Sequence, residues 1–272
     1  MNGQNPTPPE NLVPTTTPPP INPAPVYGQY GSMAPLGTDP MERTPIVGVF
    51  GAVESLLRQP RRVMFQLRQA RPGALITSLI IIAVMSAVIY GVVAGTFSGG
   101  TQVWAAPVKI VSGLLISALI CLPSLYIFSC LGGSHARLVE VLGLIAGLLA
   151  LMTIMLIGFA PVAWVFSQAT KSLVAMGVIH LLFWAVATFF GMRFLNAGFR
   201  NFSTGSDSRL GLMVWMVIFI MVSLQMSTAL RPILGKADTF LPAAADKKFF
   251  GQHWADCVNA ESENKPASWY GK

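Results

Sequence analysis

Three polar side chains interrupt long apolar stretches of the sequence: Glu140, His180 and Gln225. Such groups are costly to bury in a membrane without a partner, so each is a candidate for ligand binding, proton transfer or helix pairing. Arg137 lies three positions before Glu140, on the same face of a helix, which favours an ion pair near the membrane surface. His180 is suited to relaying protons or binding a ligand, but a hydrogen bond to a neighbouring helix explains it equally well. For Gln225 we expect an interhelical hydrogen bond.

No pattern of a catalytic, cofactor or metal site accompanies these residues. The sequence has no Walker motif, no HExxH motif and no nucleophile–base pair. His253 and Cys257 stand four positions apart but provide fewer ligands than a zinc site needs. We therefore expect that this chain is not an enzyme and binds neither a cofactor nor a metal.

The elements that position these residues are five long apolar stretches. A helix that rises about 1.5 Å per residue needs about 20 residues to cross a hydrocarbon core of about 30 Å. The composition, 53% hydrophobic and 11% charged, agrees with a membrane protein. The sequence predicts an all-α fold, a polytopic membrane helical bundle whose five transmembrane helices cover Ala74–Phe97, Ala105–Leu131, Leu138–Phe166, Leu173–Leu195 and Leu210–Leu230.

The rest of the chain divides by composition. Residues 1–44 are rich in proline and offer little to bury, so they are predicted to form a disordered tail; the PxxP spacing at residues 20–23 is expected by chance in such a tract. Residues 45–71 are basic and amphipathic, residues 72–235 hold the five spans, and residues 236–272 form a polar and aromatic tail. This tail is predicted to rest on the outer membrane interface or to contact a partner.

The basic segment before the first span has an apolar side formed by Ile46, Phe50, Val53 and Leu57 at helical spacing. Pro60 is predicted to divide it into two short helices. These helices can lie in the headgroup plane or pack on the protein's own surface, and both arrangements can hold together. In the first arrangement, anionic lipid headgroups are contacted by Arg58, Arg61, Arg62, Arg68 and Arg71.

The net charge of +7 does not indicate nucleic acid, because the basic residues stand beside the ends of the apolar stretches. Arginines gather before the first span and in alternate loops, whereas the remaining loops carry only Lys109 and Lys171. This asymmetry predicts a cytoplasmic N-terminus and, with five spans, a C-terminus outside. Trp104 and Trp164 then lie in the outer aromatic belt, although four basic residues after the last span oppose this orientation.

Glycine and proline positions bear on how the helices pack. Gly91–Gly95 and Gly143–Gly147 have the GxxxG spacing that lets helix backbones approach closely, and we expect packing within the bundle in preference to dimerisation. Pro123 and Pro161 fall inside the second and third spans. They are predicted to kink these spans and to free carbonyls that neighbouring helices or water must satisfy.

The pattern resembles the Yip1-type integral membrane proteins. The resemblance covers residues 47–230: a polar N-tail, the short basic helix with an internal proline (Leu56-Leu57-Arg58-Gln59-Pro60-Arg61-Arg62), and five closely spaced spans. Eukaryotic members of that family are implicated in vesicle trafficking and contact small GTPases, and bacterial members are mostly uncharacterised inner-membrane proteins. The segment Leu230–Gly235 is similar to bacterial members, which implies a bacterial inner (cytoplasmic) membrane. The family offers no catalytic residues.

Two hypotheses of function follow. The leading hypothesis is a non-enzymatic scaffold or assembly subunit of a membrane complex, with membrane-protein partners or self-association, since no polar groups converge within the spans. The alternative is a small membrane transporter or channel, motivated by Pro123, Pro161 and His180. Replacing His180 by alanine distinguishes the two through a flux measurement.

Overall fold

The computed structural model describes Gly3 and residues 35–100, 102–133, 136–170, 172–202, 208–230 and 249–262. Within these residues the regular structure is helical, without strands. Its helices are α1 (Pro40–Arg43), α2 (Gly48–Arg58), α3 (Pro60–Leu67), α4 (Gly73–Ser98), α5 (Gln102–Leu131), α6 (Leu138–Ala169), α7 (Leu173–Phe202), α8 (Ser208–Ala229) and α9 (Phe250–Ser262). Five of them, α4 to α8, are long and apolar enough to cross a membrane, which confirms the predicted all-α polytopic bundle.

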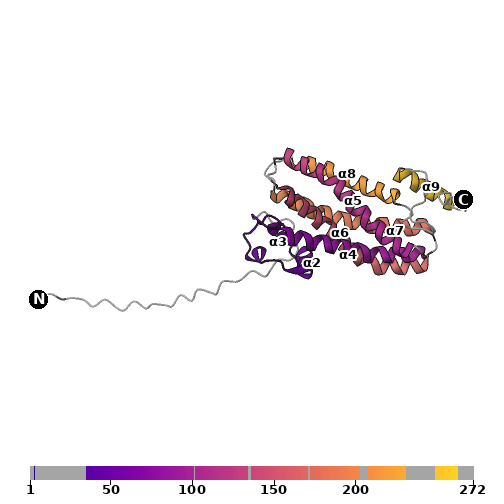
Figure 1. Ribbon diagram of the computed structural model, residues 1–272, viewed down its shortest axis with the longest axis horizontal. Coiled ribbons are helices and arrows are strands. Elements are labelled where there is room, and N and C mark those ends of the chain that lie inside the picture. Colours follow the sequence, from indigo (N-terminus) through magenta and orange to yellow (C-terminus); the bar gives the residue numbers. More distant parts are fainter. Residues whose placement is uncertain are drawn as a thin grey trace.

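Helix α6 is the centre of the bundle. It packs against α4 and α7, while α5 packs on α4 and carries α8 on another side (Figure 1). In the most apolar 18-residue stretch of α6, 72% is buried inside the protein, whereas in the corresponding stretch of α8 only 17% is buried. Residues 143–153 of α6 are buried without interruption. The core of the bundle is therefore made around α6, and α8 leaves most of its surface to the surrounding membrane.

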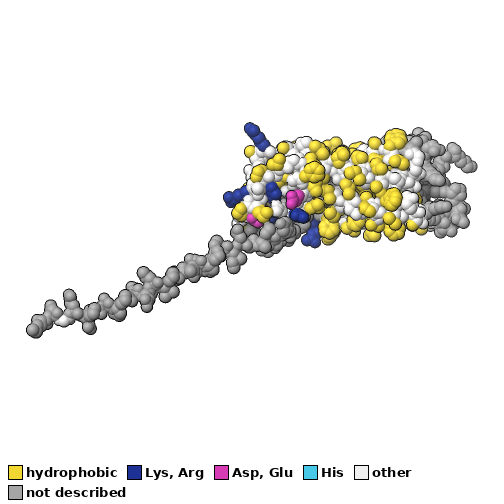
Figure 2. Space-filling model, turned by 90° about the horizontal axis from the view of Figure 1, so that it is seen from below, with side chains coloured by type: hydrophobic (Ala, Val, Ile, Leu, Met, Phe, Trp, Pro, Cys, Tyr) yellow, Lys and Arg dark blue, Asp and Glu magenta, His cyan; other side chains and the backbone are white. Residues whose placement is uncertain are grey.

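The two ends of the bundle differ in chemistry. Helices α1, α2 and α3 gather at one end and α9 lies at the other, because an odd number of long helices separates them (Figure 1). Lysine and arginine side chains cluster at the end formed by α1 to α3, and an apolar belt covers the side of the bundle beyond it (Figure 2). We call these the arginine end and the α9 end.

The helix pair α2–α3 forms where the sequence predicts it. Pro60 occupies the first turn of α3, a position that needs no backbone donor, and Gln59 separates the two helices. The side chains of Ala52 and Leu56 on α2 and of Val63 and Met64 on α3 are 0% exposed. One side of the pair therefore packs on the protein itself.

Residues 40–43 are helical, although the sequence predicts disorder as far as residue 44. The expected disordered tail extends to residue 44, but the structure folds Pro40–Arg43 into α1, and Asp39 caps this helix by accepting a hydrogen bond of 2.9 Å from the Met41 amide. An aspartate followed by proline is a helix start, with the side-chain cap before the helix and the fixed φ in its first turn. The PxxP spacing at residues 20–23 lies outside the described residues.

Candidate functional site

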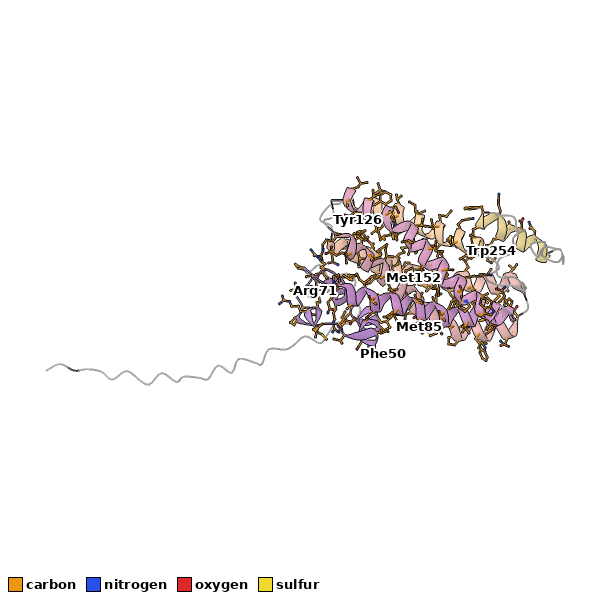
Figure 3. The ribbon with its side chains drawn as sticks, viewed as in Figure 1. Phe50, Arg71, Met85, Tyr126, Met152 and Trp254 are labelled. Atoms are coloured by element: carbon orange, nitrogen blue, oxygen red, sulfur yellow. The ribbon has the colours of Figure 1, made fainter. Side chains whose placement is uncertain are left out.

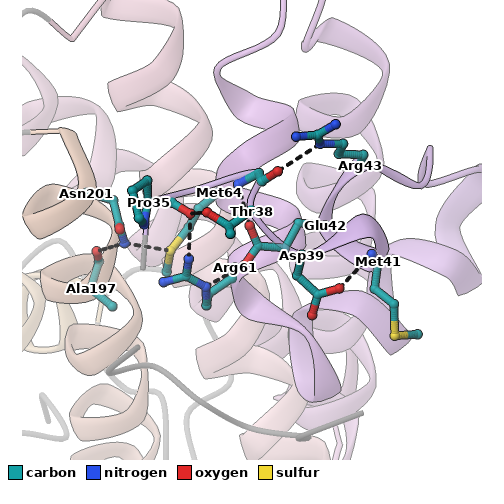
Figure 4. Close-up of polar contacts among 11 residues, drawn as sticks. Pro35, Thr38, Asp39, Met41, Glu42, Arg43, Arg61, Met64, Ala197 and Asn201 are labelled. Carbon is teal, nitrogen blue, oxygen red and sulfur yellow. Dashed lines mark hydrogen bonds and ion pairs between the residues drawn. The ribbon is translucent and has the colours of Figure 1, made fainter. Parts of the chain in front are cut away.

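Residues 35–46, which we call the strap, are held on α3 by a buried carboxylate. Glu42 is 7% exposed. It accepts a hydrogen bond of 2.5 Å from Arg61 Nε and another of 2.5 Å from the Gly37 amide (Figure 4). Because an ion pair that is only 12% and 9% exposed is poorly screened, this contact fixes the strap more firmly than a surface pair would.

The end of the strap is held by two other side chains of α3, those of Arg62 and Gln66. Arg62 donates to the carbonyls of Thr44 and Pro45 at 2.9 and 3.0 Å. Gln66 accepts from the Ile46 amide at 3.0 Å and donates to the Thr44 carbonyl. Side chains of α3 thus take the place of a regular secondary-structure partner for this piece of backbone.

The five arginines predicted to contact lipid headgroups fall into two groups. Arg61 and Arg62 are half-buried and bind the strap, whereas Arg58, Arg68 and Arg71 are exposed at the arginine end. Arg71 stands at the start of α4 (Figure 3). Contact with anionic headgroups stays a prediction for all five, and the exposed three are placed best for it.

Glu140 and Arg137 form the ion pair that their spacing predicts. Arg137 Nη2 lies 2.9 Å from Glu140 Oε1, and the Arg137 amide donates to Glu140 Oε2 at 3.0 Å, so the Glu140 carboxylate satisfies a backbone donor at the start of α6. Arg137 also donates to the carbonyls of Arg68 and Gln69 at 3.3 and 3.0 Å. The pair therefore clamps α6 to the chain between α3 and α4.

His180 pairs with a residue of another helix that the sequence analysis did not single out. The Tyr90 hydroxyl of α4 lies 2.5 Å from His180 Nδ1 of α7, with the two rings edge to face. His180 Nε2 is buried and has no hydrogen-bond partner in the described part of the chain. Helices α4 and α7 each pack mainly on α6, so this bond links two helices across the bundle.

Gln225 makes the interhelical hydrogen bond expected of it, to the C-terminal helix. Its Oε1 accepts from the Phe250 amide at the start of α9 at 3.2 Å. On α7, a Cβ added to Gly177 would lie 3.0 Å from the indole of Trp254, so the absence of a side chain makes room for this ring. Helix α9 therefore docks on both α7 and α8, and Trp254 lies at this end of the bundle (Figure 3).

The part of α5 around Pro123 receives a hydrogen bond from a neighbouring helix. Trp215 of α8 is 0% exposed and donates its indole N–H to the Cys121 carbonyl at 2.8 Å, two residues before Pro123. Ser124 Oγ donates to the same carbonyl at 2.9 Å. The Cys121 carbonyl thus gains two further donors, whereas the carbonyl that Pro123 deprives of its helical donor is that of Leu119, four residues before the proline.

Both GxxxG motifs are used inside the chain. A Cβ added to Gly91 would lie 2.5 Å from the Cα of Pro107, and one added to Gly95 would lie 2.6 Å from the Gln102 carbonyl oxygen. A Cβ at Gly143 would meet a terminal methyl group of Leu67 at 2.5 Å. The first motif brings the backbones of α4 and α5 together, which agrees with the predicted packing within the bundle.

The described interior holds several buried polar side chains, and Lys109, which the sequence analysis counted among the loops, lies inside α5 with its side chain 0% exposed. A small cavity among α4, α5 and α6 is lined by apolar side chains and by Thr153. The Thr153 hydroxyl already donates to the Leu149 and Ala150 carbonyls at 2.9 and 3.1 Å. Within the described residues no three His, Cys, Asp or Glu side chains group as metal ligands, and the side chains of His253 and Cys257 lie outside that part of the structure.

Comparisons of this chain with protein-family models, with curated proteins and with solved structures find no match. The resemblance to Yip1-type proteins therefore stays a prediction that rests on the residues quoted for it.

Proposed function

We propose that this integral membrane protein is a non-enzymatic scaffold or assembly subunit of a membrane complex. The observation that carries the proposal is the use of its intramembrane polar side chains. His180 bonds to Tyr90, Gln225 bonds to α9, and Trp215 bonds to α5, so each of these groups joins helices together. Such links favour a rigid body that presents fixed surfaces to partners.

Isolation of the intact assembly tests the scaffold role. The full chain is extracted from its own membranes in a mild detergent, and its mass is compared with that of the monomer by size-exclusion chromatography with light scattering. We expect a larger particle in which another membrane protein or a second copy is present in fixed ratio. A homogeneous monomer after cross-linking in the intact membrane would contradict the proposal.

The alternative function, a small transporter or channel, is favoured by one observation: the buried Nε2 atom of His180 without a partner among the described residues. A flux through vesicles that contain the purified protein would support this alternative. His180→Ala should then abolish the flux, while Ser167→Ala, which removes an exposed hydroxyl from the end of α6, serves as the control. A flux that His180→Ala leaves unchanged would remove the residue from the mechanism.

We also propose that the protein lies in a bacterial inner membrane with the arginine end in the cytoplasm. The support is the clustering of arginines at one end, which favours the anionic cytoplasmic leaflet (Figure 2). Ser32→Cys and Ser262→Cys, each in a background without native cysteines, are labelled in sealed cells with an impermeant reagent. We expect the reagent to label position 262 alone. Labelling of position 32 alone would show that the orientation is the reverse of the one proposed.

A further inference from the structure

Helix α2 has an apolar edge, opposite its packed side, that stands exposed among the described residues. Phe50 is 91% exposed, Val47 at the start of the helix is 79% exposed and Leu57 is 40% exposed, while Ala52 and Leu56 on the opposite side are 0% exposed. An isolated exposed apolar residue is common in proteins, but a grouped edge next to an apolar belt marks an interaction surface.

This edge continues the lipid-facing surface of the bundle. Helix α2 packs on α4, and Phe50 points away from the bundle on the same flank as Met85 of α4 (Figure 3). Met85 is 55% exposed and Ile81, one turn nearer the arginine end, is 44% exposed. Since α4 is a candidate membrane span, the surface beside α2 is the one that acyl chains cover.

The charged residues of α2 lie beside this edge. Phe50 and Leu57 are seven positions apart and share one side of the helix. Glu54, four positions after Phe50, borders this side, and Arg58 lies farther round the helix and pairs with Glu54 at 3.6 Å, with the Glu54 and Arg58 side chains 67% and 63% exposed. A helix with this division lies at a membrane interface with its apolar edge among the chains and its charged edge toward the headgroups.

We propose that the edge of α2 formed by Val47, Phe50 and Leu57 inserts into the acyl chains of the leaflet at the arginine end, with Arg58 at headgroup level. The buried side of α2 fixes the depth, because Ala52 and Leu56 are packed and the helix cannot turn to hide Phe50. The occupant is lipid in preference to a soluble partner because the edge joins the belt of α4. This anchor does not depend on the scaffold role.

Spin labels at single cysteines test the proposal. Phe50→Cys, Leu57→Cys and Glu54→Cys are made in a background without native cysteines, with Met85→Cys as the lipid-facing control. The full chain is reconstituted in vesicles of phosphatidylethanolamine and phosphatidylglycerol. The collision rate of each spin label with oxygen, which concentrates among acyl chains, is compared with its collision rate with a water-soluble nickel complex. We expect collisions with oxygen to be the more frequent at positions 50, 57 and 85, and collisions with the nickel complex to be the more frequent at position 54.

Two outcomes would overturn the proposal. If position 50 behaves like position 54, the edge lies in water. If position 50 is immobile and accessible to neither reagent, a protein surface covers it instead of lipid. Since Phe50, Glu54 and Leu57 are exposed, the substitutions leave the packed side of α2 intact, and matching elution profiles with the Met85→Cys control verify the fold.

Discussion

Replacing Gly91 by alanine should destabilise the bundle through a clash of backbones. The added Cβ would lie 2.5 Å from the Cα and 3.0 Å from the N of Pro107, so α4 and α5 must move apart. Overpacking a tight core costs about 1–3 kcal/mol, and the better helix propensity of alanine returns up to about 1 kcal/mol. We expect a net loss of about 1–2 kcal/mol in the free energy of unfolding.

Two other glycines provide a graded comparison. Gly143→Ala would meet the terminal methyl groups of Leu67, a flexible side chain that can move, so we expect a smaller loss than for Gly91→Ala. Gly158→Ala in α6 meets no atom within 4 Å and should leave stability unchanged or raise it by up to about 1 kcal/mol. The predicted order depends only on what each Cβ would touch.

Reversible unfolding in mixed micelles, with increasing sodium dodecyl sulfate, measures the three variants against the parent chain. The oligomeric state of each is determined in parallel in the mild detergent alone. Equal stability of Gly91→Ala and Gly158→Ala would refute the packing argument. A loss of oligomer with no change in monomer stability would show that the motif joins copies of the chain instead.

The remaining predictions concern polar links. Glu140→Gln should lower the free energy of unfolding by about 1 kcal/mol, because the charge-assisted bonds of a 9% exposed carboxylate weaken while the 53% exposed Arg137 keeps its contact with solvent. Glu54→Gln, at a pair exposed on both sides, should cost less than about 0.5 kcal/mol. Both are measured by the same titration. Trp215→Phe keeps a ring against Phe219 but loses the bond to the Cys121 carbonyl, so a loss of about 1 kcal/mol is expected, and no change would mean that water replaces the indole.

The five long helices were predictable because a bilayer admits few alternatives. A segment that spans the bilayer must satisfy its backbone hydrogen bonds within itself, so the length of an apolar stretch alone identifies a helix. The ends were less certain: the fourth span was expected to stop at Leu195, but α7 continues to Phe202. Arg193 marks the edge of the apolar stretch in the sequence, yet a charge does not end a helix, and its guanidinium lies over the Phe189 ring at 5.9 Å.

The strap was not predictable from local sequence. Its position depends on Arg61, which lies 19 residues after Glu42, and on Gln66, which lies 20 residues after Ile46. Neither pair has a periodic signal, and the prolines before the strap favour disorder. The aspartate and proline that start α1 were the one local signal, and they show a helix start without showing what holds it.

The candidate polar residues could be found from the sequence, but their partners could not, because the partners lie on distant helices. Tyr90 and His180 are 90 positions apart, and Gln225 and Phe250 are 25 apart. Their pairing changes the role that we assign to these residues, from candidate ligand-binding groups to links between helices. A transport cycle would have to break such links and remake them between states, whereas a scaffold keeps them closed. The flux and assembly measurements therefore test opposite consequences of the same bonds.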